Sequence, residues 1–397
     1  MVGTDRLYYT DSYLTRFEAE IVAVRPASGQ YRVYLDRTAF YPSSGGQPCD
    51  TGRIARAAVV DVAEEGEHVA HLVESELSPG AVACEIDWAR RFDHMQQHTG
   101  QHLLSAVFVE QLGYPTVSFH LGSETSTIDV EAPELSGQQI EAVEARANAL
   151  VTENRPVAAR FHSPEEAASL GLRKPSEREG PVRVVEIEGC DRSACGGTHV
   201  RATGEIGPIL IRRLDRVRQT VRVEFVCGGR AVRRARADYN ALARAAQLFS
   251  APPDQVPALV AAQIEAAKSA DKAQRKLQAE LAAFKGRELY QATPADARGR
   301  RVHQAVKPAG SIEMWRLLAQ AFTAAGPGGV FLLALEQPPM FLLALSGDIA
   351  AHAGNVVKAV AEPLGGRGGG SARLAQASLP KAALAPQVFR PVLDRLG

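Results

Sequence analysis

The chain has 397 residues, with 45 basic and 45 acidic side chains, 45% hydrophobic residues and five cysteines. This length exceeds one ordinary hydrophobic core and predicts two or three domains, and the zero net charge excludes attraction of nucleic acid by overall charge. The few, scattered cysteines argue against a disulfide scaffold and favour a reducing, cytoplasmic setting. The N-terminal sequence lacks the apolar run of a signal peptide. The longest apolar runs, VFLLAL and MFLLAL, are too short to cross a bilayer, so no membrane contact is expected.

Residues 1–90 are predicted to form a small antiparallel β-barrel. Short strand-like runs are separated by Gly, Pro, Ser and Asp clusters; they are FEAEIVAV, QYRVYLDR, ARAAVVDV, EHVAHLVE and AVACEIDW. Within this region lies FYPSSGGQPCDTG, a glycine-bearing loop at residues 40–52 where the backbone could come close to a ligand.

Residues 91–232 are predicted to form an α+β domain. Asp93 is expected to N-cap a helix that runs to Leu112, with Gly113 as its stop. A second helix is expected over residues 138–154. Antiparallel strands should follow at VAARFH, VRVVEIE, HVRA, PILIRRL and VRVEFVC.

The rest of the chain is expected to form a helical stalk, residues 233–293, and a small α/β domain, residues 294–397. Pro252 and Pro253 interrupt the stalk near its start, which suggests a helical hairpin or coiled coil. The sequence GVFLLALEQPPMFLLALSG indicates two buried strands around a turn. A glycine-rich loop around Arg367 then leads into an expected helix and could cradle phosphate.

Three histidines, His94, His98 and His102, stand four residues apart and would lie on one face of the helix that contains them. Two histidines at this spacing can hold one ion, whereas His94 and His102 are too far apart to share one. The spacing alone leaves both neighbouring pairs open. Gly100 favours His98 with His102, because a helix glycine is easier to understand where something packs closely against the backbone.

A second segment, CDRSACGGTHV, offers a thiolate and an imidazole, Cys195 and His199, separated by a flexible Gly-Gly-Thr spacer. Nitrogen and sulfur ligands favour Zn²⁺ over Mg²⁺ or Ca²⁺. The metalloprotease and nucleobase deaminase signatures are both absent. Cys190 is interpreted as a structural thiol, because Cys195 has the better local context.

The order of these motifs resembles the alanyl-tRNA editing proteins, free-standing relatives of the editing domain of alanyl-tRNA synthetase. The matching pieces are FYPSSGGQPCDTG, QHTGQHLLSAVF, VSFHLG with TIDV, CGGTHV, TGEIGPILI and VRVEFVCGGRA. The tail GGRGGGSARLAQAS looks like the DHH-associated domain that ends the long form of this family. The resemblance covers essentially the whole chain.

The resemblance implies a zinc site formed by His98, His102, Cys195 and His199. His94 stands where the family often carries arginine, and is expected to be a substrate-side or surface residue. The implied reaction is hydrolysis of the ester that joins serine, or else glycine, to alanine tRNA. Such editing is needed because a pocket for alanine cannot strongly reject glycine or an analogue with one added hydroxyl.

The resemblance also implies roles around the zinc site. Thr38 matches the threonine that faces the serine side chain, and the expected catalytic residues are Thr38, Gln47 and His120. The expected substrate contacts are Gly45, Gly46, His94, Arg222 and Arg367. Arg222 belongs to an arginine-rich run at residues 212–236 that suits tRNA phosphates. The C-terminal half could add tRNA contacts and form a homodimer.

Two functions from different classes remain open. One is a zinc-dependent hydrolase that edits mischarged alanine tRNA in trans, without an aminoacylation domain. The other is a zinc-stabilised RNA-binding module without turnover. In the first case the metal would either activate a water molecule or position the substrate, and we favour positioning.

Overall fold

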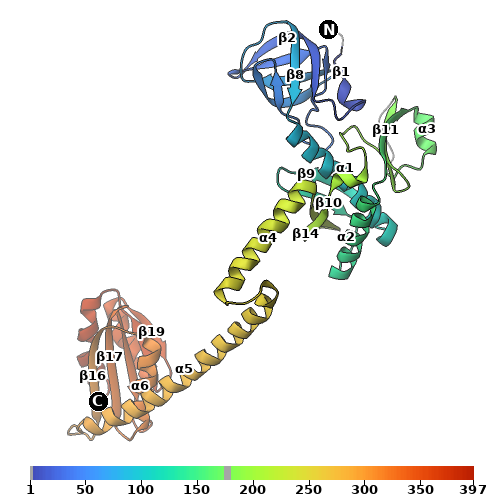
Figure 1. Ribbon diagram of the computed structural model, residues 1–397. Coiled ribbons are helices and arrows are strands. Elements are labelled where there is room, and N and C mark those ends of the chain that lie inside the picture. Colours follow the sequence, from blue (N-terminus) through green and yellow to red (C-terminus); the bar gives the residue numbers. More distant parts are fainter. Residues whose placement is uncertain (1–2, 174–179) are drawn as a thin grey trace. The chain divides into compact units, whose positions relative to one another are not determined.

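The computed structural model describes residues 3–173 and 180–397, and its contacts divide the chain into two compact units, Met1–Ala245 and Ala246–Gly397. Both units combine helices with largely antiparallel sheets (Figure 1). The mixed α+β, multidomain class is therefore confirmed, whereas the division into four segments stays a prediction. No helix in the described ranges combines the length and apolar character needed to cross a bilayer.

Six strands near the N-terminus pair in a closed antiparallel ring, called the N-terminal ring below. In order around the ring they are β2 (Arg16–Ala27), β3 (Gln30–Leu35), β7 (His68–Val73), β6 (Ala57–Glu65), β5 (Gly52–Ile54) and β8 (Gly80–Ile86). A short parallel pair, β1 (Asp5–Arg6) with β4 (Arg37–Thr38), and the 3-10 turn Leu7–Tyr9 lie beside it in the chain. Alternate side chains of these strands fill the ring's own core.

The long helix α1 (Trp88–Leu112) begins earlier than the sequence predicted. Its N-cap is Asp87, whose side chain accepts a hydrogen bond from the backbone N–H of Arg90, so the cap predicted at Asp93 was wrong. Asp93 instead forms an ion pair with Arg230. The predicted stop is confirmed, because Gly113 adopts φ 71° and its N–H caps the last turn.

The helix α2 (Gly137–Thr152) starts at a capping box of Ser136 and Gln139. A four-stranded sheet has the order β14 (Ile209–Val217), β15 (Thr220–Cys227), β10 (Ser126–Val130), β9 (Thr116–Leu121). A three-stranded sheet has the order β11 (Val157–His162), β12 (Val182–Ile187), β13 (Asp191–Ala194). The helix α3 (Pro164–Ser169) and the 3-10 turn Thr203–Ile206 complete this region.

The strand predicted at HVRA, residues 199–202, was wrong. Only an isolated bridge between Pro156 and Ala202 forms there. The backbone N–H of Val200 donates to the Thr99 hydroxyl, and the N–H of Arg201 donates to the Tyr13 hydroxyl. These two backbone N–H groups thus donate to side chains, whereas in a sheet they would donate to the carbonyl groups of a neighbouring strand.

The helix α4 (Gly228–Leu248) ends before the prolines, and α5 (Val256–Ala292) begins after them, as predicted. The second unit holds a sheet in the order β16 (Arg301–Ala309), β17 (Gly329–Gln337), β18 (Met340–Leu345), β20 (Leu374–Ser378), β19 (Arg367–Gly370). Its helices are α6 (Ile312–Ala324), α7 (Ala353–Ala361) and α8 (Phe389–Asp394), with 3-10 turns at Pro253–Gln255, Glu362–Leu364 and Ala382–Val388.

The glycine-rich tail is a strand pair, so the predicted phosphate-cradling loop and following helix were wrong. β19 pairs antiparallel with β20. A Cβ on Gly368 would lie 2.3 Å from Cβ of Ala377, which explains the glycine by close strand packing. Arg367 is exposed at the start of β19.

Candidate metal centre

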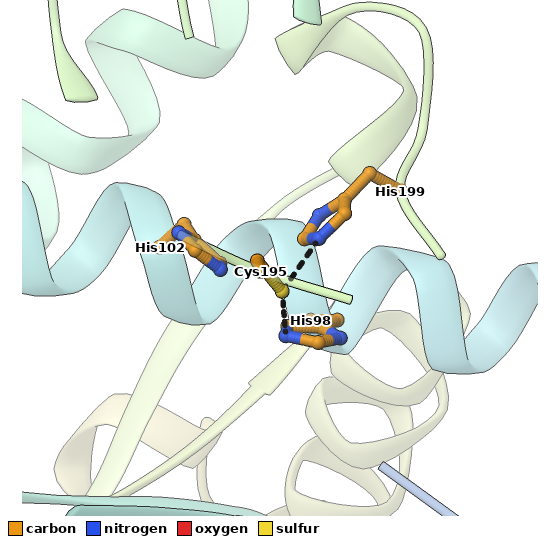
Figure 2. A group of neighbouring side chains, drawn as sticks. All are labelled: His98, His102, Cys195 and His199. Carbon is orange, nitrogen blue, oxygen red and sulfur yellow. Dashed lines mark hydrogen bonds between the residues drawn. The ribbon is translucent and has the colours of Figure 1, made fainter. Parts of the chain in front are cut away.

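Four side chains predicted as ligands meet in one buried cluster, called the His/Cys centre below (Figure 2). His98 and His102 come from α1, and Cys195 and His199 come from the loop that follows β13. One potential ligand atom from each residue lies within 4.8 Å of those of the others. The Cys195 Sγ atom lies 3.4 Å from His98 Nε2 and 3.3 Å from His199 Nε2.

Each imidazole is oriented through its other nitrogen. His98 Nδ1 donates to Gln47 Oε1 at 2.8 Å, and the same oxygen accepts from the backbone N–H of Thr198, which fixes the orientation of the amide. His199 Nδ1 lies 3.1 Å from the Thr99 hydroxyl. These contacts leave the Nε2 atoms facing the shared space, which is the arrangement that metal-binding histidines require.

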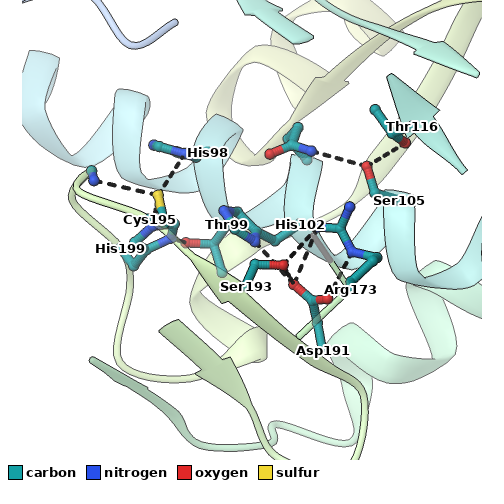
Figure 3. Close-up of polar contacts among 12 residues, drawn as sticks. His98, Thr99, His102, Ser105, Thr116, Arg173, Asp191, Ser193, Cys195 and His199 are labelled. Carbon is teal, nitrogen blue, oxygen red and sulfur yellow. Dashed lines mark hydrogen bonds and ion pairs between the residues drawn. The ribbon is translucent and has the colours of Figure 1, made fainter. Parts of the chain in front are cut away.

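His102 is held by a buried acidic network (Figure 3). Its Nδ1 donates to Asp191 Oδ2 at 2.9 Å, and that carboxylate also accepts hydrogen bonds from Arg173 and Ser193. Burial opposes a charge on the ring, but the hydrogen bonds to Asp191 and Cys195 outweigh it and raise the pKa of His102 to about 9. Burial likewise opposes ionisation of Asp191, but His102 and Arg173 hold its pKa well below the usual range.

The charge states of the two loop ligands, Cys195 and His199, suit a metal ion. Burial disfavours a thiolate at Cys195, but His98 and His199 hold its pKa well below that of a free thiol. Burial, with His98 second, lowers the pKa of His199 to about 3. A thiolate and a neutral imidazole are the forms that bind metal ions.

Arg183 holds the loop that carries Cys195. Its guanidinium donates to the carbonyl oxygens of Cys195 at 2.8 Å and Gly197 at 2.9 Å. The backbone N–H of Gly197 in turn donates to the Cys195 sulfur at 3.3 Å. The loop backbone is therefore positioned from both sides before any ligand is added.

The middle of α1 is packed against β15, which explains Gly100. A Cβ on Gly100 would lie 2.3 Å from the sulfur of Cys227. One turn earlier, the Gln97 amide exchanges two hydrogen bonds with the backbone of Cys227, at 2.8 and 3.1 Å. The close packing that the sequence predicted at Gly100 is confirmed, and the element that packs against Gly100 is β15.

The glycine loop at residues 44–47 brings the N-terminal ring to the centre. Gly45 and Gly46 have φ of 53° and 83°, and Ser44 and Gln47 exchange two backbone hydrogen bonds. These are the features of a tight turn with two left-handed positions. A Cβ on Gly46 would lie 2.8 Å from the ring of Phe119, which itself packs 5.5 Å from the His98 ring.

The two glycines of the CGGTH segment differ in a way that can be tested. A Cβ at Gly197 would lie 2.2 Å from Cε1 of His98 and 2.9 Å from Gln47 Oε1, whereas one at Gly196 would meet only Tyr9, at 3.7 Å. We expect Gly197→Ala to displace His98 and to lower metal affinity at least about tenfold. Gly196→Ala is the matched control and should bind metal like the wild type. Equal metal content in both purified variants, measured by atomic absorption after dialysis, would contradict this.

Thr38 lies in the core of the N-terminal ring. Its hydroxyl donates to His71 Nε2 at 2.8 Å, because His71 Nδ1 donates to the Val33 carbonyl, and it accepts from the Phe40 N–H at 3.1 Å. Burial lowers the pKa of His71 to about 4, which keeps its ring neutral. The Thr38 hydroxyl thus forms its hydrogen bonds with His71 and Phe40 inside the ring. Gln47, in contrast, forms a hydrogen bond with His98 of the centre.

His94 and His120 lie apart from the cluster. His94 is only 2% exposed, so the surface interpretation was wrong. Burial and the charge of Arg90 lower its pKa to about 4, and its Nδ1 atom has no hydrogen-bond partner among residues 3–173 and 180–397. His120 is exposed on β9, on the strand face opposite Phe119, since alternate residues of a strand point to opposite sides.

Two arginines, Arg222 and Arg367, were predicted to contact the substrate, and the structure gives each a different setting. Arg222 forms a two-pronged ion pair with Asp129, at 2.7 and 2.8 Å. Arg367 belongs to the second unit, and the His/Cys centre lies in the first.

Several structural partners of the centre were missed by the sequence analysis. Asp191 lies inside the segment CDRSACGGTHV, so an acid four residues before Cys195 was an available signal. Thr99 follows His98 directly within the histidine motif. Arg183 and the buried ion pair of Arg91 with Asp50 carry no local signal, because their partners are far away in the sequence.

Comparison with known proteins gives a consistent result. Residues 182–224 match the model of the threonyl and alanyl tRNA synthetase second additional domain. The alanyl-tRNA editing protein Aarsd1-B of Xenopus laevis is 35% identical over 249 residues, covering 58% of this chain and 60% of that protein. The mouse protein Aarsd1 is 38% identical and covers 51% of this chain and 53% of its own length. The alanine–tRNA ligase of Pyrococcus abyssi is 30% identical over 99% of this chain and 44% of its own length.

The chain thus spans about half the length of these relatives. Its fold and the His/Cys centre define a mixed α+β protein in which one segment, residues 182–224, is similar to the second additional domain of the threonyl and alanyl tRNA synthetases. Within that class, the chain is similar to proteins named as alanyl-tRNA editing proteins and as alanine–tRNA ligases.

Proposed function

We propose that this protein is a zinc-dependent hydrolase that removes serine or glycine from mischarged alanine tRNA in trans. The observation that carries the proposal is the cluster of His98, His102, Cys195 and His199, with three buried imidazoles and one half-buried thiol, in a chain similar to alanyl-tRNA editing proteins. The relatives named for alanyl-tRNA editing support the substrate class. The tRNA would leave the reaction intact, with its 3′ hydroxyl restored, and the amino acid would leave as a free acid.

The donor set fits Zn²⁺. Zinc bonds of about 2.3 Å to sulfur and about 2.1 Å to nitrogen place tetrahedral ligands roughly 3.6 Å apart. The two sulfur–nitrogen distances in the centre, 3.4 and 3.3 Å, are close to that separation. Three imidazoles and one thiolate also match the soft ligands that zinc prefers.

The chain's own residues prepare this site for chemistry. Gln47 and Asp191 accept hydrogen bonds from Nδ1 of His98 and His102, which turns both Nε2 atoms toward the shared space. Arg183 holds the Cys195 loop, and Phe119 covers one side of His98. A zinc ion bound there would supply a fixed positive charge for orienting the ester end of the substrate.

The direct test is to incubate the purified protein with alanine tRNA charged with serine, glycine or alanine. We expect loss of the serine and glycine esters at least about a hundredfold faster than in buffer, and little acceleration for alanine. Release of radiolabelled amino acid measures each rate. Loss of the serine ester at the rate seen in buffer would refute the hydrolase.

A second candidate is a zinc-stabilised RNA-binding module without turnover. The observation in its favour is that the centre offers four ligands, three of them 5% exposed or less, as closed structural zinc sites do. The same assay decides between the two, because the module would bind tRNA and leave all three esters intact.

We also propose that the protein is cytoplasmic. Free thiols at each of the five cysteines, all within the described residues, are consistent with a reducing compartment.

We further propose that two copies of the chain assemble through the C-terminal half. Sedimentation of the full chain would measure its oligomeric state.

A further inference from the structure

A hollow of about 380 Å³ lies beside the N-terminal half of α1, outside the His/Cys centre. It is bounded by α1, by the turn after β9 and by the start of α4. The lining residues used below are Arg90, Phe92, His94, Ser123, Arg230 and Arg233.

His94 gives this hollow a polar group that lacks a partner. The residue is only 2% exposed, it lines the hollow, and its Nδ1 atom makes no hydrogen bond within the described residues. A buried imidazole nitrogen without a partner costs free energy, because it has lost water and gained nothing in return. A ligand that hydrogen-bonds this ring would recover that cost.

Positive charge surrounds the same space. A second hollow of about 510 Å³ adjoins the first and shares Ser123, Arg230 and Arg233 with it; we call the two together the arginine groove. The second hollow adds Arg212, Arg213 and Arg234. Most of these cations have acidic neighbours, including Asp93 for Arg230.

Two arginines of the groove have no carboxylate partner in the part of the chain that the structure describes. Arg233 is exposed on α4, and Arg90 is half-buried and donates its Nε only to the Cys49 carbonyl. Their remaining donors are available for an anion. Guanidinium groups bind phosphate oxygens particularly well, because several N–H groups point the same way.

One aromatic side chain is present among the described residues that line the first hollow. Phe92 lines it, and its ring packs 5.2 Å from that of Trp88, which is 37% exposed. The Tyr13 ring also packs against that of Trp88, at 5.3 Å, and Trp88 and Tyr13 both lie outside the lining of the hollow. Proteins bind single-stranded RNA with aromatic side chains beside cations. The unstacked bases stack on the aromatic rings, and the phosphates form ion pairs with the cations.

We propose that the arginine groove binds a single-stranded segment of RNA, with phosphates on Arg233 and Arg90, a hydrogen bond to His94 and a base against Phe92. This rests on the proposed function, in which the substrate is a tRNA with an unpaired 3′ end. Because His94 lies one helical turn before His98, RNA held here would approach the His/Cys centre along α1. Duplex RNA lacks free bases and should bind the groove less well.

The test measures binding of a labelled 12-nucleotide single-stranded RNA by fluorescence anisotropy, with no ester present. We expect Arg233→Ala to weaken binding about tenfold and to reduce the slope of log affinity against log salt concentration by about 0.7. Arg244→Ala is the matched control, because Arg244 is also exposed and without an acidic partner on α4 but lies outside the groove. Equal weakening by both variants would overturn the proposal.

Two further measurements separate this site from general attraction to charge. His94→Phe fills the same space without nitrogen and should weaken binding about fivefold. Unlabelled duplex RNA should compete at higher concentrations than unlabelled single strand. Equal competition by duplex, or unchanged binding by both Arg233→Ala and His94→Phe, would rule the groove out.

The outcome is independent of hydrolysis. Wild-type protein that cleaves the serine ester but fails these binding tests would refute the groove alone. Protein that binds single-stranded RNA through the groove but leaves the ester intact would refute the hydrolase alone.

Discussion

Cys195→Ala is expected to lower the affinity for Zn²⁺ by more than about a hundredfold and to abolish deacylation. The reason is that this side chain supplies the sole sulfur of the centre, 3.3 and 3.4 Å from two of the imidazoles. Without its negative charge, three imidazoles would face one another around a dication with no compensating thiolate. Zinc content after dialysis, measured by atomic absorption, and the rate of serine release test both parts.

The matched control is Cys190→Ala. Cys190 is a partly buried free thiol five residues earlier, and it packs against the core rather than the centre. It should keep its zinc and its activity. Full zinc content in Cys195→Ala, in a folded protein, would show that the ligand assignment is wrong.

Asp50→Asn is expected to reduce the free energy of unfolding of the first unit by about 3–5 kcal/mol. Asp50 and Arg91 form an ion pair in which both side chains are fully buried. The same guanidinium donates to the Ser12 carbonyl at 2.7 Å, which joins α1 to the N-terminal segment. Neutralising the carboxylate would leave a buried cation without its counter-charge, and that is the costly case.

Urea unfolding followed by tryptophan fluorescence measures this cost. The chain has two tryptophans, and replacing Trp315 by Phe leaves Trp88, which reports on the start of α1. Glu85→Gln is the control, since its ion pair with Arg16 is exposed and such pairs contribute less than about 1 kcal/mol. A similar decrease in the free energy of unfolding in Asp50→Asn and Glu85→Gln would contradict the expectation that the buried ion pair contributes more than the exposed one.

Local patterns predicted most of the strands and both ligand segments. Strand-like runs between Gly, Pro, Ser and Asp clusters located β2, β3, β6, β7 and β8, and one face of each strand fills the ring. The two motifs could be paired in advance because their residue types share a preference for one kind of ion. Their meeting in space, across 97 residues between His98 and Cys195, came from the folded chain.

The errors arose where a distant partner decided the local structure. Asp93 is a residue type that often caps helices, but its carboxylate forms an ion pair with Arg230. Val200 is a residue type that favours strands, but its backbone N–H donates a hydrogen bond to the Thr99 hydroxyl. The glycines around Arg367 suggested a ligand loop, whereas the neighbouring strand leaves no space for a Cβ atom at Gly368 or Gly370. The partners of Asp93 and Val200 are far away in the sequence, so no local rule could have supplied them, whereas β20 follows β19 only a few residues later.

The contact between Gln47 and His98 makes the His/Cys centre depend on the N-terminal ring. The glutamine lies 51 residues before the histidine, in a turn whose shape requires two glycines. Transplanting α1 and the CGGTH segment into another scaffold would therefore carry over the four ligands but leave one imidazole free to rotate. Substitutions in the ring that spare every ligand can still alter metal loading, and genetic variants there should be judged together with those at the centre.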